Sequence, residues 1–91
     1  MLLGRVTGSL WATRKDEKLN GLKFMLVEVW NTTANQPEGN LVAADNAGAG
    51  IGDLVLVVQG KAARISAENL DVPIDAMIVG VVDSLEKNDD V

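Results

Sequence analysis

The sequence predicts an all-β domain in which five short strands close, or nearly close, into a small β-barrel with one or two short helical turns. Three observations support this prediction. Short apolar runs are separated by turn signals rich in Gly, Asn and Pro, and the first run alternates residue types as a half-buried strand does. Twelve valines against three aromatic residues also point to a core of small β-branched side chains.

The first two predicted strands run from Leu3 to Trp11 and from Leu22 to Trp30. In the first, small apolar residues share one face, and Gly4 and Gly8 on that face allow strong coiling or the close approach of another backbone. The second is largely apolar on both faces, as expected of a strand covered on two sides, for example by a neighbouring subunit. A charged loop that ends at Asn20-Gly21 joins the two strands.

The remaining predicted elements are shorter. A hairpin loop over residues 31–40 leads into a third strand, and a glycine-rich stretch leads into a fourth. We expect one helical turn over residues 60–64 and either a turn or a short helix start over residues 71–76, which contain Pro73. The last three predicted strands are Leu41–Asp45, Leu54–Gln59 and Met77–Leu85.

The length predicts a single domain over residues 1–91, with the acidic segment 87–91 as a frayed tail. A domain of 9.6 kDa buries only about 60–65% of its unfolded surface, so its core is thin. Burying further surface between subunits would therefore stabilise it.

The composition excludes several classes of function. The chain has no Cys and no His, which removes disulfides, thiolate metal sites and any Ser-His-Asp triad. Its formal charge of −5 and its few aromatic residues disfavour nucleic-acid binding. The longest apolar run, Leu54–Val58, is far shorter than a membrane span, and no signal peptide precedes Gly4. These features predict a soluble, intracellular, non-catalytic protein with no cofactor, metal, nucleic-acid or membrane partner.

The most distinctive motif is Gly48-Ala49-Gly50-Ile51-Gly52. A dinucleotide-binding fingerprint needs the spacing G-x-G-x-x-G and a following helix, whereas this motif has the spacing G-x-G-x-G, no Lys and a following strand. Two interpretations fit better. The glycines supply positive φ values in a tight turn between strands, or several copies of the loop pack around a symmetry axis where side chains would clash.

Five aspartates lie at separate turns and strand ends, and none belongs to the D-x-D-x-D-G pattern of a calcium loop. We interpret them as solvated turn residues and strand-end caps rather than as a catalytic pair or a metal site. They are Asp45, Asp53, Asp71, Asp75 and Asp83.

Four further residues are candidates for contacts between subunits, each with an ordinary alternative. Asp83 closes an apolar strand and could pair with Arg5 or Arg64, while Arg64 is either a plain surface arginine or part of an intersubunit ion pair. Trp11 and Trp30 end their strands, where a core role and an exposed contact role are both compatible with the sequence. We select Arg64, Asp83 and Trp30 as the predicted intersubunit contacts.

Taken together, the segments of the chain resemble the EutN/CcmL family of bacterial microcompartment vertex proteins. The resemblance covers about residues 1–85, and although each motif alone is weak, their combination is specific. The matching segments are Leu2–Gly8, Ala12–Lys15, Leu19–Lys23, Leu41–Asp45, Gly48–Asp53, Val55–Val57, Gly60, Ala63–Arg64, Pro73–Ala76 and Ile78–Asp83.

The resemblance implies a five-stranded barrel related to the OB fold and assembled into a cyclic pentamer. Pentamers of this family cap the five-fold corners of polyhedral shells that enclose enzymes in the bacterial cytoplasm, and hexamers form the flat facets of those shells. We therefore expect a structural protein rather than an enzyme, with copies of itself and hexameric shell proteins as partners. We also hypothesise that Gly48, Ala49, Gly50, Ile51 and Gly52 of each copy line a narrow opening at the five-fold axis.

The alternative function is an OB-like binding module for a nucleic acid or a small ligand, against which the acidic charge and the scarcity of aromatic residues argue. A small enzyme is a third possibility, but the sequence offers no general-base constellation for it.

Overall fold

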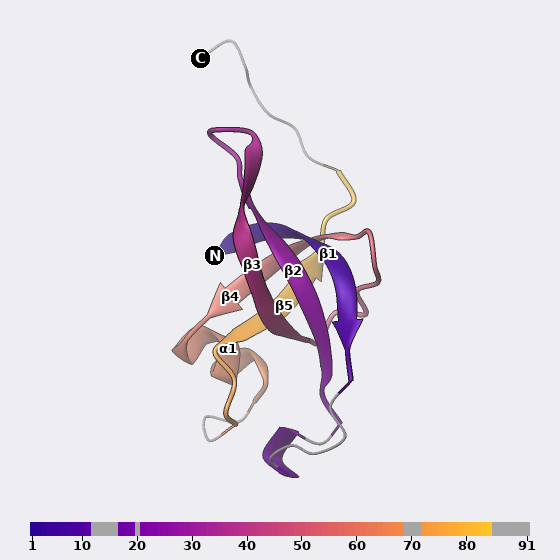
Figure 1. Ribbon diagram of the computed structural model, residues 1–91. Coiled ribbons are helices and arrows are strands. Elements are labelled where there is room, and N and C mark those ends of the chain that lie inside the picture. Colours follow the sequence, from indigo (N-terminus) through magenta and orange to yellow (C-terminus); the bar gives the residue numbers. More distant parts are fainter. Residues whose placement is uncertain (12–16, 20, 69–71, 85–91) are drawn as a thin grey trace.

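Five strands form a closed barrel in the computed structural model, which describes residues 1–11, 17–19, 21–68 and 72–84 (Figure 1). Around the barrel the strands follow the order β1-β2-β3-β5-β4. The predicted five-stranded barrel is therefore confirmed. The strands are β1 (Leu2–Leu10), β2 (Lys23–Asn31), β3 (Gln36–Asp45), β4 (Leu54–Gln59) and β5 (Ala76–Val81), with a 3₁₀ turn at Glu17–Leu19 and the helix α1 at Lys61–Ser66.

The hairpin between β2 and β3 is tighter than predicted, and the expected loop over residues 31–40 was wrong. The strands continue pairing as far as Asn31 opposite Gln36, which leaves only residues 32–35 in the turn. The Asn31 side chain stabilises this turn, because its Oδ1 accepts hydrogen bonds from the backbone N–H groups of Thr33 and Ala34 at 3.0 and 2.9 Å. Pro37 is tolerated because this end of β3 has a neighbouring strand on one side only.

Several other predicted boundaries also shift. The first strand begins and ends one residue earlier than predicted, and the second begins and ends one residue later. The helical turn expected over residues 60–64 is a longer helix, Lys61–Ser66, and the described part of the segment 71–76 contains no helix start. The last strand begins one residue earlier than predicted and ends at Val81, although Val82 still donates a hydrogen bond to the carbonyl oxygen of Leu54 at 2.7 Å. Leu85, the predicted tail at 87–91 and Asp71 lie outside the described residues.

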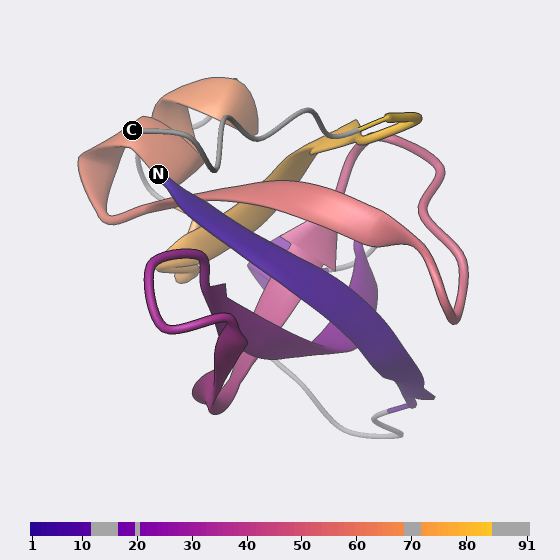
Figure 2. The same ribbon diagram turned by 90° about the horizontal axis from the view of Figure 1, so that it is seen from above.

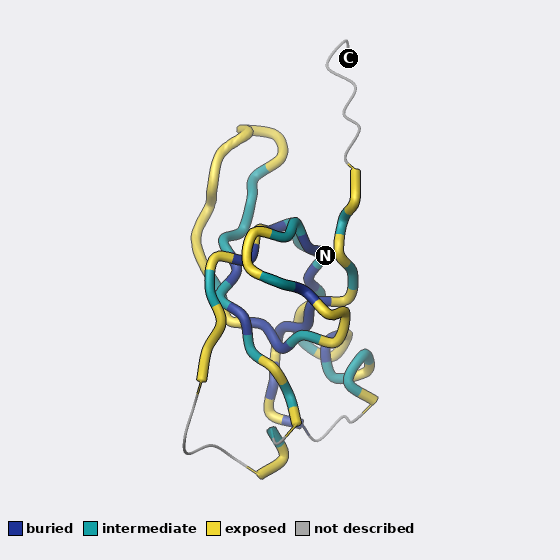
Figure 3. Tube along the Cα trace, turned by 90° about the vertical axis from the view of Figure 1, so that its right-hand side faces the viewer, coloured by how far each residue is buried: buried dark blue, intermediate teal, exposed yellow. Residues whose placement is uncertain are grey.

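The core is built from small and medium apolar side chains, as the abundance of valine predicts. The larger cluster draws its members from the barrel strands and Ala49, and a smaller one includes Ala63 of α1. Buried residues are concentrated around the barrel in Figure 3. The barrel cluster contains Val6, Met25, Val27, Ala43, Ala49, Val55, Val57, Ala76 and Ile78, and the second contains Ala44, Ala63, Val72, Ile74 and Met77. No helix among the described residues is long and apolar enough to cross a membrane.

Gly4 permits the closest approach between β1 and β2. A Cβ atom at this position would overlap Cγ1 of Val27 and lie 2.8 Å from the carbonyl oxygen of Glu28. Gly8 lies at a register shift in the same strand pair, where the nearest atom to an added Cβ is the Cβ of Leu26 at 3.9 Å. The predicted close approach of another backbone is therefore confirmed at Gly4 but not at Gly8.

Two features extend outward from the barrel. The connection between β3 and β4 projects on the side away from α1 (Figure 2). The tip of the β2–β3 hairpin extends beyond one end of the barrel (Figure 1).

Candidate functional site

The connection between β3 and β4, residues 46–53, is called the glycine loop below. Its first half is anchored by Asp45, whose side chain is only 2% exposed. The two carboxylate oxygens of Asp45 accept hydrogen bonds from the N–H groups of Ala47 and Ala49, each at 2.9 Å. Lys23 Nζ lies 3.9 Å from Asp45 Oδ2 and donates to the carbonyl oxygen of Ala49 at 3.0 Å. Asp45 therefore caps the end of β3 as predicted, but the expectation that it is solvated was wrong, because its side chain is buried against the loop that it holds.

The second half of the glycine loop is attached to β1. Gly52 donates from its N–H to the carbonyl oxygen of Val6 at 2.8 Å, and Val6 donates to that of Asp53 at 2.9 Å. Arg5 Nη1 donates to the carbonyl oxygen of Gly52 at 2.7 Å. Asp53 closes the turn, because its Oδ2 accepts from the N–H of Gly50 at 2.8 Å. The loop is thus held at both ends, which fixes the position of its tip.

The five residues proposed for the symmetry axis differ in exposure. Gly48, Ile51 and Gly52 are exposed, Gly50 is half-buried and the side chain of Ala49 is packed inside the barrel of its own subunit. Ile51 is 68% exposed at the tip. Gly48 and Gly52 have φ values of 76° and 93°, so the prediction that glycines supply positive φ values is confirmed at these two positions.

Removing the Asp45 carboxylate should destabilise the subunit through its loop. We expect Asp45→Ala to lower the free energy of unfolding by about 2 kcal/mol, because the N–H groups of Ala47 and Ala49 lose their acceptors and Lys23 loses its counter-ion. Urea denaturation at a fixed protein concentration measures this loss. The control is Glu17→Ala, which removes an exposed carboxylate and should change the free energy by less than about 0.5 kcal/mol. Equal effects of the two variants would contradict the anchoring role.

The three predicted intersubunit residues lie at separate places. Trp30 is half-buried near the end of β2, opposite Pro37. Arg64 has a partner within its own subunit, since its Nη1 donates to the carbonyl oxygen of Ile74 at 3.3 Å. Asp83 is exposed just beyond β5, and among the described residues no ion pair joins it to Arg5 or Arg64.

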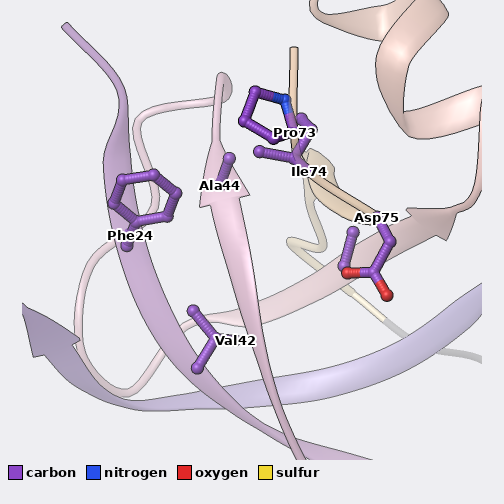
Figure 4. Close-up of a pocket in the computed structure, with 7 residues that line it drawn as sticks. Phe24, Val42, Ala44, Pro73, Ile74 and Asp75 are labelled. Carbon is purple, nitrogen blue, oxygen red and sulfur yellow. The ribbon is translucent and has the colours of Figure 1, made fainter. Parts of the chain in front are cut away.

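The sequence did not reveal a pocket of about 180 Å³ between β3 and the segment that leads into β5 (Figure 4). Its walls come from three separate segments, which no local motif could identify. The side chains that line the pocket are mostly apolar, with one carboxylate. No group of three or more potential metal ligands occurs among the described residues. The lining residues are Phe24, Val42, Ala44, Pro73, Ile74, Asp75 and Ala76.

A comparison with known protein families matches almost the whole chain. The family model described as "Ethanolamine utilisation protein EutN/carboxysome" matches residues 1–83. The chain belongs to this EutN/CcmL family. The resemblance seen in the sequence is therefore confirmed over almost its full extent.

Relatives of this EutN/CcmL chain are named as shell vertex proteins. The carboxysome shell vertex protein CcmL of Synechocystis is 41% identical over 85 residues, which are 93% of this chain and 85% of that protein. The bacterial microcompartment shell vertex protein PduN of Salmonella typhimurium is 39% identical over 89 residues, covering 93% of this chain and 98% of that one.

Solved structures of EutN/CcmL relatives match the fold over nearly the whole chain. Gloeobacter violaceus CcmL has a TM-score of 0.88 at 36% identity, covering 97% of this chain and 91% of the other. The structure titled "GrpN pentameric microcompartment shell protein" from Rhodospirillum rubrum has a TM-score of 0.82 at 40% identity, covering 96% of this chain and 100% of the other.

Proposed function

We propose that this chain is a structural shell protein, five copies of which form a closed ring that caps the five-fold vertices of a bacterial microcompartment. The observation that carries the proposal is the match of 96% of the chain to a pentameric shell protein at 40% identity and a TM-score of 0.82. At this identity and coverage the two chains share a fold throughout. The relatives named as vertex proteins supply the place of the ring in the shell.

The surface of the subunit supports assembly. Several large apolar side chains are exposed, among them Trp11 at 91% and Ile51 at 68%. A thin core gains stability when such side chains are buried between copies. A closed ring with head-to-tail contacts uses two different patches on each subunit, so the exposed apolar residues need not gather in one place.

The glycine loop is the part of the ring that we place at the five-fold axis. Gly48, Gly50 and Gly52 have no side chains, and small residues are required where five backbones converge. Ala49 contributes its backbone only, because its side chain is buried in its own barrel. The anchoring of the loop at both ends supports a fixed opening. Trp30, Arg64 and Asp83 remain proposed contacts between neighbouring subunits.

In this proposal the ring has no catalytic task, needs no cofactor and resides in a shell within the bacterial cytoplasm. Its partners are hexameric shell proteins that form the facets around each vertex. The family membership favours this role over the OB-like binding module, because the relatives are named for a place in a shell rather than for a ligand.

Electron cryo-microscopy of shells tests the proposal. The full chain is co-expressed with the hexameric shell proteins of its own organism, and the purified shells are reconstructed with and without it. We expect a five-fold ring that fits this fold at each vertex, and empty vertices when the chain is omitted. Shells whose vertices look the same in both preparations would contradict the proposed function.

A further inference from the structure

The barrel closes through a very short contact between β3 and β5. These parallel strands pair at only two positions, Ala44 with Met77 and Asp45 with Ile78, whereas β3 pairs with β2 as far as Gln36. Within the described chain, residues 36–43 of β3 therefore have no partner strand on their second edge. An open edge of this length exposes backbone N–H and C=O groups to pairing with other chains.

A pocket lined mainly by apolar side chains lies where the open edge meets the closed part of the barrel. Val42 belongs to both features and is 47% exposed, and the half-buried ring of Phe24 forms the neighbouring wall (Figure 4). Asp75 is the charged residue among the lining side chains. We use the name seam for the open edge of β3, residues 36–43, together with this pocket.

The wall of the pocket formed by residues 73–76 is already fixed in the isolated subunit. Arg64 Nη1 holds the carbonyl oxygen of Ile74, and the N–H of Gly60 donates to the carbonyl oxygen of Asp75 at 2.8 Å. These two hydrogen bonds tie residues 73–76 to α1 and to Gly60, the residue that precedes α1. A surface that is ordered before binding loses little conformational entropy when it is covered.

A second apolar face lies on the other side of the barrel. In the strand order, β1 is opposite the junction of β3 and β5. The half-buried side chains of Leu3 on β1 and Leu56 on β4 are paired across the strands. Two residues further along, and on the same face, the exposed Arg5 pairs with Leu54. This face therefore combines apolar side chains with a cation, whereas the seam combines apolar side chains with the carboxylate of Asp75. The two faces are different, as the two halves of a head-to-tail contact must be. Arg5 on one is opposite in charge to Asp75 on the other, although Glu28 is paired with Arg5 across β1 and β2.

We propose that the seam of each subunit is covered by a second copy of this chain, which packs its β1–β4 face, formed by Leu3, Leu56 and Arg5, against it. This inference rests on the proposed pentamer and assigns the surfaces that join its neighbours. It places Val42 in the centre of the contact and the backbone of residues 36–43 beneath the neighbouring subunit.

Val42→Glu tests the seam. The side chain lies on the outer surface, so the subunit should remain folded, but the ring would have to bury a second carboxylate beside that of Asp75, with only Arg5 of the facing copy to offset both. We expect the protein concentration at half-assembly to rise about a hundredfold or more by analytical ultracentrifugation, with an unchanged circular dichroism spectrum. The control is Ile65→Glu, which places the same group at an apolar position on α1 that is 58% exposed, and this variant should assemble as the wild type does.

Mixing two variants tests the pairing of the faces. Val42→Glu blocks the seam, and Leu3→Glu blocks the β1–β4 face. Each variant alone should be monomeric, but an equimolar mixture should form dimers, because one intact seam can meet one intact β1–β4 face. A mixture that stays monomeric would show that the two faces are not partners.

Hydrogen exchange of the wild-type ring provides a measurement that does not depend on any variant. The outward-facing amides of residues 39–43 should exchange slowly in the ring and quickly in monomers obtained by dilution.

A ring that persists in Val42→Glu, or one whose β3 edge exchanges as quickly as in the monomer, overturns this inference alone. A wild type that forms no ring overturns the proposed function as well. A Val42→Glu ring that assembles but no longer enters shells would assign the seam to a different shell protein and reject the second copy as its occupant.

Discussion

Gly50→Leu is expected to convert the ring into folded monomers. The backbone of the isolated subunit allows a side chain here, because an added Cβ would lie 3.7 Å from Asp53 Oδ2, its nearest neighbour beyond the adjacent residues, and the φ angle of Gly50 is not positive. At the five-fold axis the same side chain would be repeated in every copy within a narrow space. Sedimentation velocity should show one species of about 10 kDa in place of one of about 48 kDa, while the far-ultraviolet spectrum stays unchanged.

Gly50 is the glycine of the loop at which a leucine tests ring assembly without straining the backbone of the subunit. Gly48 and Gly52 adopt positive φ values, so a leucine at either position would strain the subunit itself and obscure any effect on assembly. Ala62→Leu provides the control, since it adds a comparable side chain at an exposed position on α1. If Gly50→Leu sediments as the wild type and Ala62→Leu do, the loop does not lie at the axis.

Gly4→Ala is expected to cause the largest loss of stability of any substitution proposed for this chain. The added Cβ would overlap Cγ1 of Val27, which is fully buried, and approach the carbonyl oxygen of Glu28 to 2.8 Å. Val27 belongs to the core cluster and the Glu28 carbonyl to the paired backbone of β2, so moving either one aside disturbs the barrel. Overpacking of this kind costs about 3 kcal/mol, which corresponds to a fall of roughly 12–24 °C in the melting temperature of a domain of this size.

Gly8→Ala is the matched control, because it makes the same chemical change in the same strand where the nearest atom would be 3.9 Å away. We expect its melting temperature to stay within a few degrees of the wild type. Differential scanning calorimetry of both variants at one protein concentration measures the difference. Equal melting temperatures would mean that β1 and β2 separate enough to absorb the extra methyl group, contrary to the packing described above.

The sequence predicted the strands well where the apolar pattern had clear limits. The fourth strand was placed at Leu54–Gln59, as observed, because an uninterrupted apolar run lies between Asp53 and Gly60. The hairpin between β2 and β3 was predicted poorly, because its polar residues are typical of a loop rather than of paired strands. In the structure those residues pair across an exposed ladder, and the capping of the turn by Asn31 depends on a three-dimensional arrangement.

The candidate site was predictable in composition but not in geometry. The three glycines identified the loop, and two of them adopt the positive φ values that were expected. The anchors could not be found in the same way, because Lys23 and Arg5 lie 26 and 47 residues from the loop carbonyl groups that they bind. The seam was hidden for the same physical reason: its edge is open only because β5 meets β3 over two pairs of residues.

The mass of the intact assembly tests the central claim most directly. Native mass spectrometry of the full-length wild-type chain gives this mass and counts the subunits without reference to any relative. Five copies of 9.6 kDa predict a single species of about 48 kDa. A monomer of about 10 kDa, or a six-membered ring of about 58 kDa, would contradict the proposal that this protein closes five-fold vertices.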